Sequence, residues 1–157
     1  MHPRAEAFVE RAASIGMDVT VREFPEGTKT AADAAAAIGC DVAQIASSIA
    51  MVADGAVVVV TSGANRVDPG KLASLRGVDP GAVRTADPEE VKSTLGWAIG
   101  GVPPFCHDET VPVYLDESLL AFDTVWAAAG TPEAVFPVDP ERVVELADAT
   151  PADVAEE

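Results

Sequence analysis

The chain has 157 residues, and its 26 acidic side chains outnumber ten basic ones to give a formal net charge of −16. This length suits one domain with a proper core, so we expect residues 1–157 to form a single folded unit. Hydrophobic residues make up 48% of the chain, but no apolar run approaches the ~20 residues of a membrane-spanning helix, and the N-terminus lacks an apolar signal core. We therefore expect a cytoplasmic protein that does not associate with membranes.

The strong negative charge has two explanations. Taken alone, it disfavours a nucleic-acid partner, because nucleic-acid binders usually present a basic face. It also suits a protein adapted to molar salt, where the Debye length is ~3 Å and repulsion between surface carboxylates is largely screened. We expect a halophilic source. The negative charge would then reflect adaptation to salt more than the nature of the binding partner.

Helices and strands alternate along the chain. Capped or amphipathic helices are predicted over residues 3–16, 31–38 and 41–45, from Asp68 to Gly77, from Asp87 to Gly96, and from Asp139 to Ala147. Strands are predicted over residues 19–24, 49–53, 56–61, 111–115, 122–127 and 135–138, with a turn at 25–27.

The clearest structural signal is a β-hairpin. Asp54-Gly55, a dipeptide that favours a type I′ turn, joins the apolar runs 49–53 and 56–61. The consecutive valines 57–60 predict burial on both faces of the second strand, so this strand should be central in its sheet. Several strand pairs are joined too tightly for parallel crossovers, and the sequence therefore predicts a mixed α/β architecture.

A segment rich in glycine and proline near the middle of the chain is the main candidate for function. It reads Gly100-Gly101-Val102-Pro103-Pro104-Phe105-Cys106-His107. Two adjacent glycines let the backbone approach a ligand closely, and two prolines fix the chain just beyond them. A tight corner between two strands would use the same residues, because Gly and Pro are above all turn formers.

Side chains with obvious chemistry are sparse elsewhere. His107 is a candidate acid or base near neutral pH, with a plain structural histidine as the alternative, and His2 lies near the terminus. Cys40 and Cys106 are far apart and form no metal-spacing motif, so we expect free thiols. We expect no metal and no other cofactor, because no cluster of ligands has suitable spacing. Asp116, at a strand end, could orient a substrate or cap the next turn.

Several motifs follow one another in a fixed order along the chain. They are Thr30 to Ala35, Gln44 to Ile49, Ser62 to Asp68 with Lys71-Leu72, Gly100 to Phe105, Asp116, and Trp126 to Pro132. Together they resemble the YbaK/prolyl-tRNA-synthetase-associated editing domain family, over about residues 20–145.

The resemblance implies a strongly curved, mixed and largely antiparallel sheet surrounded by helices. It also implies an aminoacyl-tRNA deacylase acting in trans, which hydrolyses the ester between a wrong amino acid and the 3′-terminal adenosine of tRNA. Family members favour Ala- or Cys-tRNA(Pro). The implied partners are misacylated tRNA and an aminoacyl-tRNA synthetase, and the family needs no metal.

In such an enzyme the loop from Gly100 to Pro104 would help to form the aminoacyl pocket. Backbone N–H donors aimed at a developing oxyanion can contribute roughly 3–4 kcal/mol each. The candidate catalytic residues are Gly100, Gly101, Ser47 and His107. The candidate substrate-binding residues are Thr30, Ser48, Arg66, Val102, Pro103, Pro104, Phe105, Asp116, Gly130 and Thr131.

The chain departs from the family pattern at Ser47, where the family usually carries a lysine. A serine can donate one hydrogen bond but brings no positive charge to a phosphate. Cys106 also replaces a common glycine, and Ala128 lies where some members have serine. Either Arg66 or Lys71 supplies the missing charge, or the substrate has changed, or catalysis has been lost.

Two other functions therefore stay open beside the deacylase. One is a non-catalytic member that binds aminoacyl-tRNA or a synthetase, which the change at Ser47 and the acidic charge favour. The other is a hydrolase of a small acylated metabolite, which would use the same loop without a basic track for tRNA.

The charge pattern gives a first testable prediction. If the acidic surface is an adaptation to salt, the melting temperature should rise by several degrees between low and molar KCl, because screening removes repulsion among carboxylates. Thermal unfolding followed by circular dichroism in a KCl series measures this. Equal melting temperatures at both ends of the series would contradict the prediction of a halophilic source.

Overall fold

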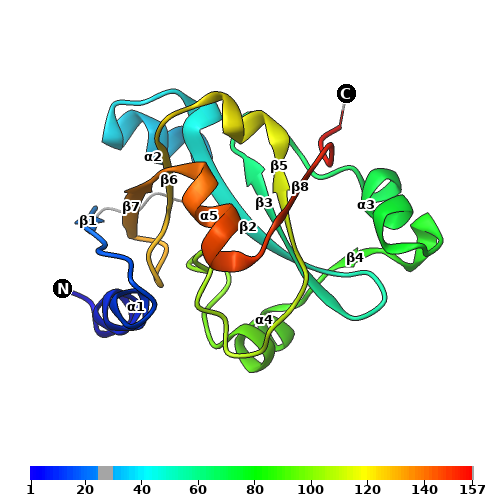
Figure 1. The fold of residues 1–157 in the computed structure, drawn as a ribbon, viewed down its shortest axis with the longest axis horizontal. Coiled ribbons are helices and arrows are strands. Elements are labelled where there is room, and N and C mark those ends of the chain that lie inside the picture. The colour runs from blue at the N-terminus through cyan, green and yellow to red at the C-terminus, as the bar shows by residue number, and fades with distance from the viewer. Residues whose placement is uncertain (25–29, 157) are drawn as a thin grey trace.

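The computed structural model describes residues 1–24 and 30–156, in which a mixed β-sheet is surrounded by helices (Figure 1). The α-helices are α1 (Pro3–Ser14), α2 (Ala31–Ile38), α3 (Pro69–Arg76), α4 (Pro88–Leu95) and α5 (Pro140–Ala147). The strands are β1 (Arg22–Glu23), β2 (Ile45–Val52), β3 (Ala56–Ser62), β4 (Arg84–Thr85), β5 (Val113–Asp116), β6 (Val125–Ala128), β7 (Ala134–Val138) and β8 (Thr150–Ala152). The 3₁₀ turns are η1 (Val42–Gln44), η2 (Pro80–Ala82) and η3 (Glu117–Ala121). Within these described ranges, no helix has the length and apolar character needed to cross a bilayer.

The sheet has the strand order β1-β7-β6-β2-β3-β5-β8, and β4 also pairs with β2. Strand β2 runs antiparallel to β3 and β4 but parallel to β6. The β3–β5 and β5–β8 pairs are parallel, whereas β7 is antiparallel to both β6 and β1. This mixed, mostly antiparallel sheet within a shell of helices confirms the predicted fold class.

The hairpin β2–β3 lies at the centre of the sheet. Asp54 and Gly55 both have positive φ, at 57° and 91°, which a type I′ turn requires. The valines 57–60 are fully buried, as their apolar run predicts. Because side chains alternate along a strand, Val58 and Val60 pack into the main core while Val57 and Val59 pack into a second cluster under α3.

Short polar residues start the helices where the sequence predicts. The side chains of Thr30, Asp68, Asp87 and Asp139 accept hydrogen bonds from backbone N–H groups in the first turns of α2, α3, α4 and α5. These bonds satisfy donors that a helix start otherwise leaves unpaired. Helices α3, α4 and α5 also begin with proline, whose fixed φ suits the first helical position.

The main core lies between the sheet and helices α1, α4 and α5. An aromatic cluster occupies its centre. The Phe8 ring centroid lies 5.0 Å from that of Phe136 and 5.5 Å from that of Phe105, and the Trp97 ring meets Phe8 edge-on at 6.1 Å. Full burial of a phenylalanine side chain contributes about 1.5–3 kcal/mol, so this cluster fixes α1 firmly on the sheet.

The margins of the sheet differ from the prediction. Strand β1 covers only residues 22–23 of the predicted 19–24, and η1 with the start of β2 replaces the helix predicted over 41–45. Strands β4 and β8 were not predicted, because two or three residues are too few to show a period of two. The turn predicted at 25–27 lies outside the described residues.

Asp116, at the end of β5, joins three segments of the chain. Its Oδ2 accepts hydrogen bonds from the Asn65 side-chain amide at 2.9 Å and the Ser62 N–H at 3.1 Å. Its Oδ1 accepts one from the Ser118 hydroxyl at 2.7 Å. Burial alone would raise the pKa of this carboxyl, but the bonds from Asn65, Ser118 and Ser62 outweigh burial and hold the pKa below its ordinary value. Asp116 also caps η3, which is one of the two roles that its position suggested.

Asp116→Asn tests this junction. The amide places a donor against groups that now donate to the carboxylate, so the free energy of unfolding should fall by about 2 kcal/mol at neutral pH. Because the folded pKa lies below the unfolded value of about 3.9, the wild-type advantage is present above that value and is lost as the pH falls through the folded pKa. Urea unfolding across a pH series measures both effects. Equal stability of the two proteins at neutral pH would contradict the role given to Asp116.

Candidate functional site

A cavity lies where strand β2 lacks neighbours along one edge. Strand β6 pairs with β2 only at Ile45 and Ala46, and β4 pairs with it only at Met51 and Val52. Among the described strands, none pairs with residues 47–49 on this edge. The space left beside β2 is a cavity of about 300 Å³.

The cavity is small and mostly apolar. Helix α2, strands β2 and β6, and the glycine loop each contribute part of its wall. The lining residues are Thr30, Ala31, Ala34, Ile45 to Ala50, Thr85, Val91, Ile99, Gly100, Val102, Trp126 to Ala128, Pro132 and Val135. None of these carries a charged side chain. An apolar pocket of this size with a few polar groups is typical of a small-molecule binding site.

The glycine loop packs directly against a second stretch of backbone. A Cβ added to Gly101 would lie only 2.7 Å from the Cα of Thr131, and one added to Gly100 would lie 3.4 Å from the Cγ of Pro132. Gly100 also has a φ of 85°, which side chains disfavour. The Gly101 N–H donates to the Ala98 carbonyl at 3.0 Å. Gly101 therefore allows the loop to pack closely against the Thr131 backbone, and its N–H is already hydrogen-bonded within the loop.

Polar groups without a protein partner lie on the cavity wall. The Ser48 Oγ is buried and has no hydrogen-bond partner among the described residues. Within residues 1–24 and 30–156, neither the Gly100 N–H nor the Val102 N–H donates to a backbone carbonyl. Val102 is only 2% exposed, and buried N–H groups are almost always paired. Among the described residues, the Ser48 Oγ and the Val102 N–H are thus polar groups of the cavity lining without a protein partner, and the Gly100 N–H, in an exposed residue, is without a backbone partner too.

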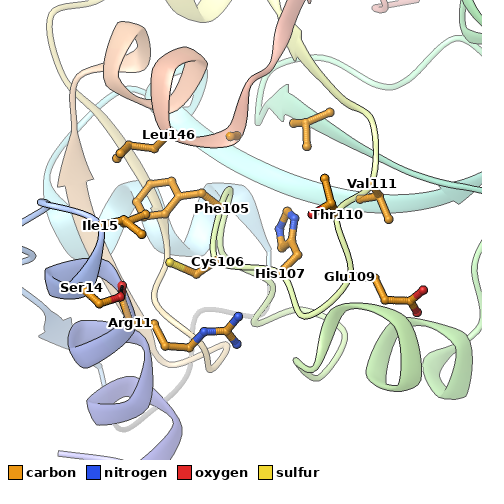
Figure 2. Close-up of a pocket in the computed structure, with 12 residues that line it drawn as sticks. Arg11, Ser14, Ile15, Phe105, Cys106, His107, Glu109, Thr110, Val111 and Leu146 are labelled. Carbon is orange, nitrogen blue, oxygen red and sulfur yellow. Dashed lines mark hydrogen bonds between the residues drawn. The ribbon is translucent and has the colours of Figure 1, made fainter.

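His107 and Phe105 line a different cavity, of about 330 Å³, beside helix α1 (Figure 2). The Nε2 of His107 lies 2.8 Å from the Pro103 carbonyl oxygen, so this nitrogen carries the proton. Burial lowers the pKa of the imidazole below its ordinary value, which keeps the ring neutral at physiological pH. The Phe105 ring also belongs to the aromatic cluster of the core.

The structure thus brings together Thr30, Ser47, Ser48, Gly100 and Val102 from the predicted site. Other predicted site residues next to these in the fold are buried and do not line the cavity: Gly101, Pro103, Pro104, Gly130 and Thr131.

Arg66 and Asp116 also lie outside the cavity lining. The carbonyl of Arg66 accepts a hydrogen bond from the Glu156 N–H at 2.8 Å, which places Arg66 beside the C-terminal segment. Lys71, the other residue considered as a source of positive charge, lies 2.9 Å from Asp153 through its Nζ. The charge missing at position 47 is not restored at the cavity by either side chain.

Several lining residues escaped the sequence analysis as site residues. They include Ala34, Thr85, Ile99, Trp126, Ala127 and Pro132. Trp126 is the one of these residues whose type hints at a binding site. It is a half-buried aromatic residue that lies between two buried residues of β6. The alanines gave no indication of a site in the sequence, because alanine is as common in a hydrophobic core as in the wall of a pocket.

The two cysteines are free thiols, as predicted. Burial raises the pKa of both the Cys40 and the Cys106 thiol above its ordinary value, so neither is a thiolate at neutral pH. In the part of the chain that the structure describes, no group of three or more His, Cys, Asp or Glu side chains is placed to hold a metal ion.

Comparison with known proteins identifies the family. The chain matches the aminoacyl-tRNA editing domain over residues 25–146. "Uncharacterized protein YwhH" of Bacillus subtilis (strain 168) is 32% identical over 128 residues, which is 80% of this chain and 80% of that protein. The chain therefore belongs to the aminoacyl-tRNA editing domain family, which confirms the resemblance seen in its motifs.

Solved structures agree with this assignment. The "Crystal structure of a putative trans-editing enzyme for prolyl tRNA synthetase" matches with a TM-score of 0.93 and 42% identity, covering 100% of this chain and 99% of that one. The structure of hypothetical protein APE2540 matches with a TM-score of 0.83 and 28% identity, covering 94% of this chain and 97% of that one.

Gly101→Ala tests the packing of the glycine loop. The new Cβ would press on the Thr131 backbone, which cannot move as a side chain can, so the free energy of unfolding should fall by about 1–3 kcal/mol. Gly81→Ala is the matched control, because nothing lies within 4 Å of a Cβ at that position, and it should stay within about 0.5 kcal/mol of wild type. Urea unfolding measures both variants. Equal effects of the two substitutions would contradict the close backbone contact.

Proposed function

We propose that the protein is a trans-acting deacylase that hydrolyses the ester of a misacylated tRNA, with Ala- or Cys-tRNA(Pro) as substrate. The observation that carries this proposal is a set of polar groups in the lining of a small apolar cavity, namely Ser48 Oγ and the N–H groups of Gly100 and Val102, which have no protein partner among the described residues. Membership of the editing domain family supports an ester of tRNA as the ligand.

In this mechanism the ester carbonyl oxygen lies at the N–H groups of Gly100 and Val102. Water attacks the carbonyl carbon, and the negative charge that develops on the oxygen is stabilised by these donors, each contributing roughly 3–4 kcal/mol. The bond to the ribose oxygen then breaks, the ribose oxygen takes the proton that the attacking water loses, and the free amino acid leaves with the water's oxygen in its carboxyl group. The Gly101 amide takes no part, because Ala98 already accepts its hydrogen bond.

Selectivity in this proposal depends on the size of the side chain that the cavity admits. Ala34, Ala46 and Ala127 keep the walls close and apolar. An additional methylene in such a pocket changes binding by only about 1–3 kcal/mol, so alanine and cysteine should be accepted together and proline disfavoured. The hydroxyl groups of Thr30, Ser47 and Ser48 would bind the polar end of the amino acid and the ribose.

Removal of one hydroxyl tests the proposal. Wild-type protein should deacylate Ala- or Cys-tRNA(Pro) faster than Pro-tRNA(Pro), and Ser48→Ala should lower kcat/KM by about tenfold, because one hydrogen bond to the substrate is lost. Thr110→Ala, which removes a hydroxyl from the other cavity, is the matched control and should keep the wild-type rate. Release of the labelled amino acid from charged tRNA, in salt that keeps all variants folded, measures these rates.

One result would contradict the proposed site, and two others would favour a different function. Equal losses in the Ser48 and Thr110 variants would contradict the assignment of the cavity. Tight binding of charged tRNA with no release of amino acid would favour a non-catalytic member that binds aminoacyl-tRNA or a synthetase. Hydrolysis of small acyl esters without activity on charged tRNA would favour a metabolite hydrolase.

A further inference from the structure

We propose that Arg22 binds the phosphate on the 5′ side of the terminal adenosine while the ester occupies the cavity. This inference rests on the proposed function, because it assigns a positioning residue beside the same cavity. It concerns the charged part of the substrate, for which the described lining residues of the cavity offer no charged side chain.

Arg22 is held against the cavity wall. In the β1–β7 pair it lies opposite Val135, which lines the cavity. Its guanidinium carbon is 5.5 Å from the ring centroid of Trp126, another lining residue, and 5.3 Å from that of Phe24. The positive charge therefore lies next to a side chain that lines the cavity.

The stacking on Trp126 and Phe24 leaves the guanidinium free to bind an anion. Stacking uses the faces of the planar group, and the N–H donors along its edge stay available for two parallel hydrogen bonds to a phosphate. Arg22 is exposed, and within residues 1–24 and 30–156 it forms no ion pair. Arg22 is thus a cation stacked on two aromatic rings, with no acidic partner among the residues that the structure describes.

The charges of the rest of the protein make this position important. With a net charge of −16, the surface as a whole repels RNA. Arg11 is paired with Asp108, and Arg84 with Glu90. The Arg84 guanidinium also reaches a lining residue, through the Thr85 carbonyl, but its charge is already paired with Glu90. The Arg22 guanidinium lies over the lining residue Trp126 and has no ion pair among the described residues. The ribose that carries the ester also carries the 5′ phosphate, so this phosphate must lie within one nucleotide of the cavity.

Binding of two small probes tests the inference without any chemical step. Wild-type protein should bind 5′-AMP about tenfold more tightly than adenosine, because charge-assisted hydrogen bonds are made only with the phosphate. Arg22→Gln should abolish this preference and leave the affinity for adenosine unchanged, and Arg22→Lys should keep part of it. Arg142→Gln, which removes the same charge from α5, should keep the full preference. NMR titrations in constant KCl measure each affinity, and melting temperatures verify that each variant is folded.

Persistence of the preference for 5′-AMP in Arg22→Gln, or its absence in wild type, would overturn the inference. Steady-state kinetics give a second readout, in which Arg22→Gln raises KM for charged tRNA with kcat unchanged. An active enzyme whose KM is the same in Arg22→Gln would contradict the inference alone. A wild type inactive on every charged tRNA, but with a preference for 5′-AMP that depends on Arg22, would support the inference and contradict the proposed function alone.

Discussion

The close approach of two backbone segments, at Gly101 and Thr131, is the constraint on which the site depends. A Cβ on Gly101 would lie 2.7 Å from the Thr131 Cα, so only glycine allows the two loops to meet at this distance. Gly100 and Val102, the two neighbours of Gly101, both line the cavity. The proposed catalysis by backbone donors needs them fixed before the substrate arrives, and the close backbone contact between the two loops would favour this rigidity.

The sheet supplies the rest of the site through an interruption in its pairing. Strand β2 is held by β3 along one edge, but on the other edge β6 and β4 pair only with its two ends. The unpaired middle of this edge, with Ser47 and Ser48, is the floor of the cavity. A strand edge inside a protein normally has to be covered, and here a bound substrate would cover it. Helix α2 and strand β6 line the same cavity, with the small side chains of Ala31, Ala34, Ala127 and Ala128 and the large one of Trp126.

Much of the fold could be predicted from the sequence, because its signals are local. The Asp54-Gly55 turn, the helix caps and the buried valines are each set by residues that are neighbours in the chain. The site could be predicted only in part. The sequence indicated the loop at Gly100 as part of the site. It could not show that the Gly101 N–H donates to the Ala98 carbonyl or that His107 lines another cavity, because both depend on the folded arrangement of the chain. Arg22 gave no signal, since its role follows from packing against Trp126, which is distant in sequence.

The most direct test of this account is the site of binding of a stable substrate analogue. 3′-Alanylamino-3′-deoxyadenosine replaces the ester oxygen with nitrogen and should bind without being hydrolysed. Backbone-amide NMR spectra recorded during its titration should show the largest shift changes at Ser48, Gly100 and Val102. Changes concentrated at His107 and Thr110, around the second cavity, would contradict the claim that backbone donors of the glycine loop receive the ester carbonyl.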